Sequence, residues 1–123
     1  MRDILAAAEA GEPDSELAVR AFCYRAKKYV GAYLSILGGA DAVIFGGGIG
    51  ENLPKIREGI CAGFEWAGLQ LDPTENTVVL RSDAKISGAG SAIEAWVVQV
   101  DEAAVIACDV IERLRNDGTE GPE

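Results

Sequence analysis

The stretch Ala42-Val-Ile-Phe-Gly-Gly-Gly-Ile-Gly-Glu-Asn52 is the most informative part of this 123-residue chain. Its short apolar run predicts a strand over 42–45, and three consecutive glycines then break that strand. A helical pattern with Pro54 in its first turn follows. Strand, glycine-rich turn and helix together let bare backbone approach a ligand and direct a helix N-terminus at phosphates. We therefore hypothesise that residues 46–52, called the glycine turn below, bind a nucleotide.

The glycine pattern is a weak indication when it is taken alone, because glycine-rich turns also serve tight packing. No Lys-Ser or Lys-Thr pair follows the glycines, so the stretch is not a Walker A loop. The spacing of Gly46, Gly48 and Gly50 does not match the dinucleotide fingerprint either. From these residues alone, a nucleotide site and a flexible or tightly packed turn both stay open.

Helices alternate with apolar strands around the glycine turn. The sequence predicts helices over 3–10, 14–37, 54–63 and 102–114, with Asp101 capping the last one. It predicts strands over 42–45, 77–80 and 95–100, a connector over 66–71 and a loop over 87–91. This order predicts an α/β fold with a short parallel sheet, in which strand 42–45 is buried on both faces. We expect one domain over 1–115 and a disordered tail over 116–123.

Apolar periodicity assigns buried faces to the predicted helices. In the long helix the expected buried stripe is Val19, Phe22, Ala26, Tyr29, Tyr33 and Ile36. In the helix after the glycine turn it is Ile56, Ile60 and Phe64, and in the last helix it is Val105, Ile106, Val110, Ile111 and Leu114. Gly31 lies within the long helix and indicates a close contact there.

The chain is acidic, with 11 Lys and Arg against 20 Asp and Glu and a formal net charge of -9. Such a charge repels nucleic acid and anionic membranes, so neither is expected as a partner. It also repels ATP at long range, so an ATP site must provide local donors, a metal ion or both. Neither a membrane-spanning run nor a signal-peptide pattern is present, and we expect a cytoplasmic protein.

The cysteine and histidine content limits the chemistry. Cys23, Cys61 and Cys108 are widely spaced within apolar helical patterns, which predicts three small buried thiols rather than a disulfide framework or a zinc site. Histidine is absent, so no mechanism that needs an imidazole base is complete within this sequence. Arg57, at the start of the helix predicted over 54–63, is interpreted as a surface arginine, and a role facing phosphate is the alternative.

The residues from Asp41 to Asn52 closely resemble the signature near the C-terminus of acetate kinases. Met1-Arg2-Asp3-Ile4 resembles that family's aromatic-Arg-Asp element, and residues 22–33 resemble its long helix. Ile86-Ser87, Ser91 and Val97-Val-Gln-Val-Asp-Glu102 follow its closing strand and helix cap in the same order. The resemblance extends from Met1 to about Leu114 and leaves few other families open.

This resemblance implies an acetate kinase, a homodimeric transferase of the actin, Hsp70 and sugar-kinase superfamily with a ribonuclease-H-like C-terminal domain. Such a kinase transfers the γ-phosphoryl group of ATP to acetate or propionate and yields an acyl phosphate and ADP, with Mg²⁺. The resemblance implies that Gly47, Gly48 and Ile49 lie against the nucleotide and that Asn52 and Ile56 line the adenine pocket. It also implies that Arg2 approaches the nucleotide and that Glu102 helps to position magnesium. The alternative for Arg2 is a solvated side chain at the chain terminus, and the alternative for Glu102 is a first-turn helix residue.

The resemblance covers only the C-terminal part of a two-domain kinase, and it departs from the family at Gly46, Leu53, Gln99 and Val100. The family's acetate pocket, catalytic arginines and histidine have no counterpart here, so we expect no catalysis by this chain alone. It is a fragment or remnant of a kinase, one half of a two-chain enzyme, or a non-catalytic nucleotide-binding or oligomerisation module. An open sheet edge favours a homodimer.

Overall fold

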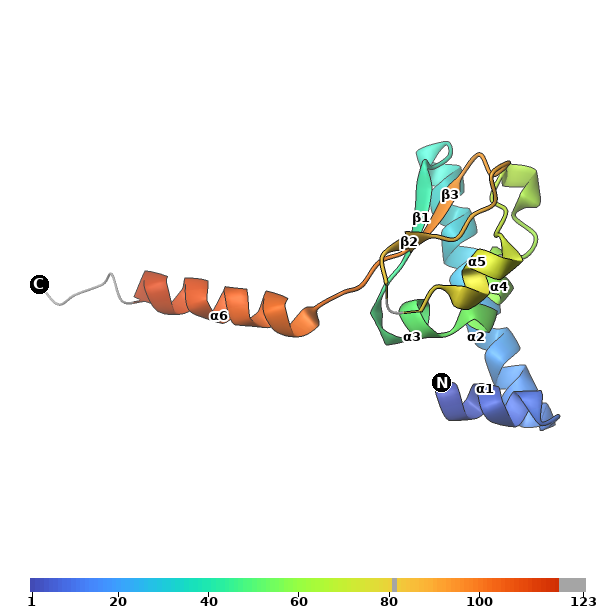
Figure 1. Ribbon diagram of the computed structural model, residues 1–123, viewed down its shortest axis with the longest axis horizontal. Helices are drawn as coiled ribbons and strands as arrows, with labels where there is room; N and C mark the ends of the chain where they lie inside the picture. Colours follow the sequence, from blue (N-terminus) through green and yellow to red (C-terminus); the bar gives the residue numbers. More distant parts are fainter. Residues whose placement is uncertain (81, 118–123) are drawn as a thin grey trace, which may run out of the picture.

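The computed structural model describes residues 1–80 and 82–117, and it has a mixed α/β body from which the last helix projects (Figure 1). The helices are α1 (Arg2–Glu9), α2 (Pro13–Leu37), α3 (Gly47–Asn52), α4 (Pro54–Cys61), the 3-10 turn η1 (Glu65–Ala67), α5 (Pro73–Val78) and α6 (Glu102–Asp117). The strands are β1 (Ala42–Phe45), β2 (Ala84–Lys85) and β3 (Glu94–Val97). The predicted α/β class is confirmed.

The sheet has the order β1-β3-β2. Strands β1 and β3 pair in parallel from Ala42 opposite Glu94 to Phe45 opposite Val97, as the sequence predicts for its two main apolar strands. The short strand β2, which the sequence does not predict, adds to β3 in antiparallel orientation. The prediction that β1 is buried on both faces is wrong, because Ile44 keeps 65% of its surface exposed.

The hydrophobic core lies between the sheet and the helices α2 and α4 (Figure 1). Ile56, Ile60 and Phe64 are buried in it, which confirms the predicted apolar face of α4. A Cβ atom on Gly31 of α2 would lie 3.5 Å from the ring of Phe64, so the predicted close contact at this glycine is also confirmed. The core thus fixes α4, which is the helix that follows the glycine turn.

The buried stripe of α2 follows a different line from the predicted one over its second half. Tyr29, Tyr33 and Ile36 are exposed, with Ile36 at 79%, so their assignment to the core is wrong. The stripe that packs against the body is Val19, Phe22, Cys23, Ala26, Val30 and Leu34. Both lines have helical spacing, and the choice between them depends on where Phe64 and the sheet lie.

The predicted strand over 77–80 is wrong, since α5 occupies residues 73–78. Asp72 caps this helix, and its Oδ1 accepts hydrogen bonds from the backbone N–H groups of Thr74 at 2.8 Å and Glu75 at 3.0 Å. Pro73 follows at the first helical position, where its fixed φ suits a helix. This start signal overrides the β-branched residues that favour a strand.

Helix α6 extends away from the body (Figure 1). The backbone N–H of Ala104 donates to Asp101 Oδ1 at 2.9 Å, which confirms the predicted cap. The five predicted core positions of α6 are nevertheless 49–67% exposed, so their assignment to a core within this chain is wrong. Helix α6 ends at Asp117, so the prediction of a disordered tail from residue 116 is wrong for residues 116 and 117, and residues 118–123 lie outside the described residues.

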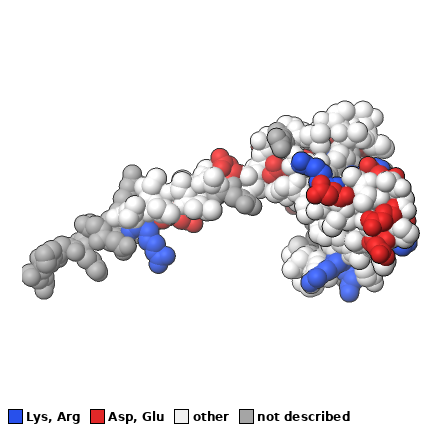
Figure 2. All heavy atoms as spheres, turned by 90° about the horizontal axis from the view of Figure 1, so that it is seen from below, with Lys and Arg blue, Asp and Glu red and all other residues white. Residues whose placement is uncertain are grey.

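The charges are distributed unevenly over the surface. In the view of Figure 2, acidic side chains gather on the body, whereas α6 shows long uncharged stretches. Within the described ranges, no helix is long and apolar enough to cross a membrane.

Candidate functional site

The glycine turn is folded as a short helix in the structure. Residues 47–52 form α3, with Gly46 as its extended N-cap, so the prediction of a non-helical turn is corrected. The chain enters α3 at Gly47 with φ of 69°, a left-handed conformation that glycine adopts without a steric cost. The turn therefore places helical backbone directly at the end of β1.

The glycines of the turn fall into two classes according to what surrounds them. A Cβ atom on Gly46 would lie 2.9 Å from a methyl group of Val100, and a Cβ atom on Gly50 would lie 3.0 Å from the carbonyl carbon of Phe45. Around Gly47 and Gly48, in contrast, a Cβ atom would meet nothing within 4 Å. A Cβ atom at Gly46 or Gly50 would thus clash with a neighbour, while Gly47 and Gly48 leave space beside the backbone for an approaching molecule.

Side chains at the end of α3 fix the turn. Asn52 Nδ2 donates to the carbonyl oxygen of Gly48 at 2.9 Å. Glu51 Oε1 accepts a hydrogen bond from the backbone N–H of Val100 at 3.0 Å. Since Val100 lies two positions before Glu102 in the sequence, this bond holds the segment that leads into α6 against the turn. The structure thus brings together two segments that the family resemblance places at one site.

Arg57 is the largest fully buried side chain among the described residues, with 0% of its surface exposed. Its interpretation as a surface arginine is therefore wrong, and so is the alternative of a role facing phosphate. Its guanidinium is enclosed by the ends of α3 and α5, and α5 was not predicted as a helix. Burial lowers the pKa of the Arg57 guanidinium below its ordinary value, but arginine remains charged in proteins.

For the other predicted site residues, Ile56, Arg2 and Glu102, the described part of the structure shows no contact with an open surface of the glycine turn. Ile56 is 1% exposed and packs in the core, so a ligand would contact it only if neighbouring side chains moved. Arg2 begins α1 with an exposed side chain, and no hydrogen bond or ion pair within the described residues joins it to the glycine turn. Glu102 begins α6, but its side chain lies outside the described residues. Within 1–80 and 82–117, no group of three or more acidic, cysteine or histidine side chains is arranged to hold a metal ion.

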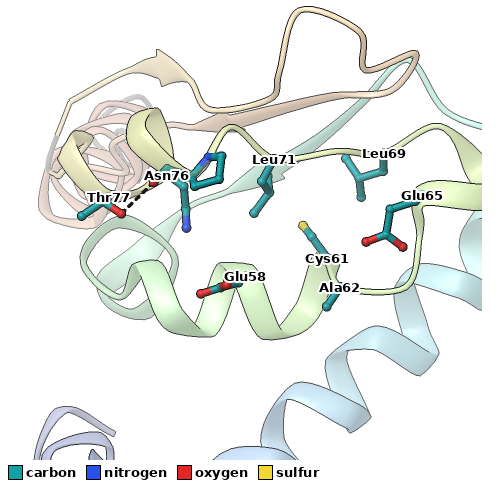
Figure 3. A pocket seen from close by; sticks show the side chains of 9 residues that line it. Glu58, Cys61, Ala62, Glu65, Leu69, Leu71, Asn76 and Thr77 are labelled. Carbon is teal, nitrogen blue, oxygen red and sulfur yellow. Dashed lines mark hydrogen bonds between the residues drawn. The ribbon is translucent and has the colours of Figure 1, made fainter.

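A hollow of about 260 Å³ lies between α4, η1 and α5 (Figure 3) and is lined by none of the predicted site residues. Glu58 and Glu65 line it, and hydrogen bonds from the backbone N–H groups of Glu65 and Gly63 lower the pKa of the Glu65 carboxyl. Acidic side chains repel a polyphosphate. The hollow is therefore a poor nucleotide site.

The cysteines do not add a reactive group to this region. Cys61 points into the hollow (Figure 3), and burial raises the pKa of its thiol to about 12. Its thiol is thus neutral at physiological pH and a poor nucleophile. Cys23 is also buried, as predicted, whereas the prediction is wrong for Cys108, which is exposed on α6.

Comparison with known proteins identifies what this arrangement is similar to. The sequence profile of the acetokinase family matches residues 1–108. An acetate kinase from Solibacter usitatus is 54% identical over 95 residues, which make up 77% of this chain and 23% of that protein. The crystal structure of Porphyromonas gingivalis acetate kinase has a TM-score of 0.81 at 37% identity and covers 92% of this chain and 28% of that one.

A propionate kinase from Francisella tularensis has a similar structure, with a TM-score of 0.76 and 30% identity over 86% of this chain and 27% of its own. The chain spans about a quarter of the length of the relatives that it matches. These likenesses confirm the predicted ribonuclease-H-like fold class, of which the chain holds one part.

Proposed function

This chain belongs to the acetokinase family, and on that premise we propose that it is the nucleotide-binding, C-terminal part of an acetate kinase. The reaction proposed for the whole enzyme is transfer of the γ-phosphoryl group of ATP to a short carboxylate, acetate or propionate, in the cytoplasm. The observation that supports the nucleotide site is the open space beside the backbone of Gly47 and Gly48, in a turn where a Cβ atom on either of the other two glycines would clash. Because the chain spans about a quarter of its relatives, catalysis is proposed only for a complete enzyme.

In this proposal the glycine turn binds ATP or ADP through its backbone. Gly47, Gly48 and Ile49 lie against the nucleotide, because the absence of side chains at the two glycines lets the phosphates come close. Asn52, which is bonded to the Gly48 carbonyl, holds the turn in shape and faces the adenine. Ile56 supports the turn from the core, and Arg2 completes the nucleotide site when the rest of the kinase is present.

In this proposal, magnesium binds together with the nucleotide and is not held by the protein alone. Mg²⁺ commonly uses one or two carboxylates together with substrate phosphates and water. Glu102 is the proposed carboxylate, and the bond between Val100 and Glu51 holds the backbone near it against the turn. The metal would neutralise the negative charge on the phosphates, which this acidic chain otherwise repels.

A second candidate function is a non-catalytic oligomerisation module, and exposed apolar side chains favour it. Tyr29, Tyr33 and Ile36 on α2, and Val105 and Ile106 on α6, are all more than half exposed. Contiguous exposed apolar side chains commonly mark protein interfaces. We propose a homodimer in this case, in which a second copy covers these faces.

A calorimetric titration of the full chain with ADP and Mg²⁺ tests the proposed function. We expect micromolar binding, with a Kd of about 1–100 µM, from the wild-type chain. Asn52→Ala should abolish the binding heat, since it removes the amide bonded to Gly48. The matched control is Gln70→Ala, which removes an exposed amide outside the turn and should bind as the wild type does. Absence of heat from folded protein would contradict nucleotide binding, and a dimeric mass by light scattering would then favour the second function.

A further inference from the structure

The guanidinium of Arg57 is fully buried. Among residues 1–80 and 82–117, no acidic side chain forms an ion pair with it. Its Nε donates to Asn76 Oδ1 at 2.8 Å, and its Nη2 donates to the carbonyl oxygens of Asn76 and Val79. Its Nη1 donates to the carbonyl oxygens of Gly50 at 2.7 Å and Glu51 at 3.2 Å. All five N–H donors of the side chain thus have acceptors inside the protein.

Those acceptors belong to two separate elements. Gly50 and Glu51 lie in the last turn of α3, whereas Asn76 and Val79 lie towards the end of α5. A buried charge without a counter-ion is unfavourable unless polar groups surround it. The carbonyl groups at the C-terminal end of a helix carry partial negative charge, and here two helix ends face one cation. Arg57 therefore joins α3 to α5 as well as filling space between them.

The glycine turn needs hydrogen bonds from the rest of the protein to hold its backbone, because of its composition. Four of its seven residues are glycine, and glycine loses more conformational freedom on folding than any other residue. The turn's own side chains contribute the bond from Asn52 to Gly48 and the bond from Val100 to Glu51. Arg57 adds two bonds to the backbone of the same turn from inside the protein.

We propose that Arg57 is a positioning residue for nucleotide binding. It holds the Gly50 and Glu51 carbonyls from within the protein, and so fixes the orientation of Gly47 and Gly48 towards the ligand. Asn76 acts with it by holding the guanidinium from the side of α5, where its Nδ2 also donates to the Pro54 carbonyl at 3.1 Å. This inference rests on the proposed function, because it assigns Arg57 a role at the same nucleotide site.

The test compares ADP binding by Arg57→Lys and Asn76→Ala in the full chain with Mg²⁺. Lysine keeps the charge but lacks the planar fork that spans α3 and α5. We expect both variants to bind ADP about 10–100-fold more weakly at a temperature where each is fully folded, because a small misplacement of a binding group is costly. The control is Leu69→Val, a buried change outside the turn that lowers stability and should leave the ADP affinity within about twofold of wild type.

Amide hydrogen exchange separates positioning from a general loss of stability. The N–H of Leu53 donates to the Ile49 carbonyl at 3.0 Å and reports on the closing of α3. The N–H of Ile86 donates to the Ala95 carbonyl at 2.8 Å and reports on opening of the sheet. In Arg57→Lys and Asn76→Ala, exchange at Leu53 should accelerate more than exchange at Ile86, whereas Leu69→Val should not show this difference.

Wild-type ADP affinity in folded Arg57→Lys and Asn76→Ala would overturn the inference. If the wild-type chain itself binds no ADP, the proposed function fails, and the exchange data alone then decide whether Arg57 holds the turn. Equal acceleration at Leu53 and Ile86 in both variants would overturn that role as well.

Discussion

The chain alone is expected to form no ADP from ATP when acetate or propionate is added. Phosphoryl transfer depends on positioning the acceptor and on neutralising charge around the transferred group. Within the described residues, the arginine nearest in sequence to the glycine turn is Arg57. Its guanidinium N–H groups all donate hydrogen bonds to acceptors inside the protein. Histidine is absent from the sequence, and the chain spans about a quarter of its relatives. Under the proposed function, the groups on the acceptor side of the phosphate belong to the rest of the enzyme.

A coupled assay for ADP release, with and without the carboxylate, measures this directly. Kinases typically turn over at about 1–100 per second, and we expect the chain to give only the rate of the carboxylate-free blank. A full-length relative in the same assay serves as the positive control. Carboxylate-dependent turnover that co-purifies with the chain and disappears in Asn52→Ala would contradict this expectation and would show that a complete site is present.

The same substitution at two glycines of the turn is expected to lower stability at one of them and not at the other. Gly50→Val places a side chain 3.0 Å from the backbone of Phe45, which cannot move without disturbing β1. Such overpacking costs about 1–3 kcal/mol or more, out of a total stability of about 5–15 kcal/mol for an ordinary domain. Gly48→Val places the same side chain in open space, so its stability should lie within about 0.5 kcal/mol of wild type.

Comparing the two variants shows which glycine is needed for the stability of the turn and which one is needed for contact with the ligand. Gly48→Val should unfold like the wild type in urea but bind no ADP, because its side chain occupies the space of the nucleotide. Gly50→Val should shift the urea midpoint to lower concentration and bind ADP weakly or not at all. Normal ADP binding by Gly48→Val would place the ligand somewhere other than over the open glycines.

Much of the fold could be predicted because the decisive signals are local. The apolar run 42–45, the glycines after it and Pro54 predict a strand, a break and a helix from neighbouring residues alone. The Asp101 cap is local in the same way. Parallel pairing of β1 and β3 follows from the helices between the apolar strands, and it was predicted correctly.

The wrong predictions of secondary structure and burial arise where contacts with distant parts of the chain determine the structure. The strand preferences of residues 77–80 give way to the cap at Asp72, so residues 73–78 form α5 and Arg57 becomes buried beneath it. Because this helix was not predicted, the burial of Arg57 could not be predicted either. Likewise, periodicity predicted an apolar face on α6 but could not show that nothing within the described chain covers it.

The candidate site was predicted mainly through the family resemblance rather than through the residues themselves. Glycines that serve packing and glycines that face open space look alike in a sequence. The structure separates Gly46 and Gly50 from Gly47 and Gly48 by their surroundings. No local signal indicated the hydrogen bonds that Arg57 makes to the turn.

The most direct test of the central claim is to map where ADP binds, by following backbone amide signals of the full chain in NMR during a titration with ADP and Mg²⁺. If the nucleotide lies over the glycine turn, the largest shifts occur at Gly47, Gly48, Ile49 and Asn52, with smaller shifts at Val100. Shifts confined to the hollow lined by Glu58, Cys61 and Glu65, or no shifts in the glycine turn at saturating ADP, would contradict this location.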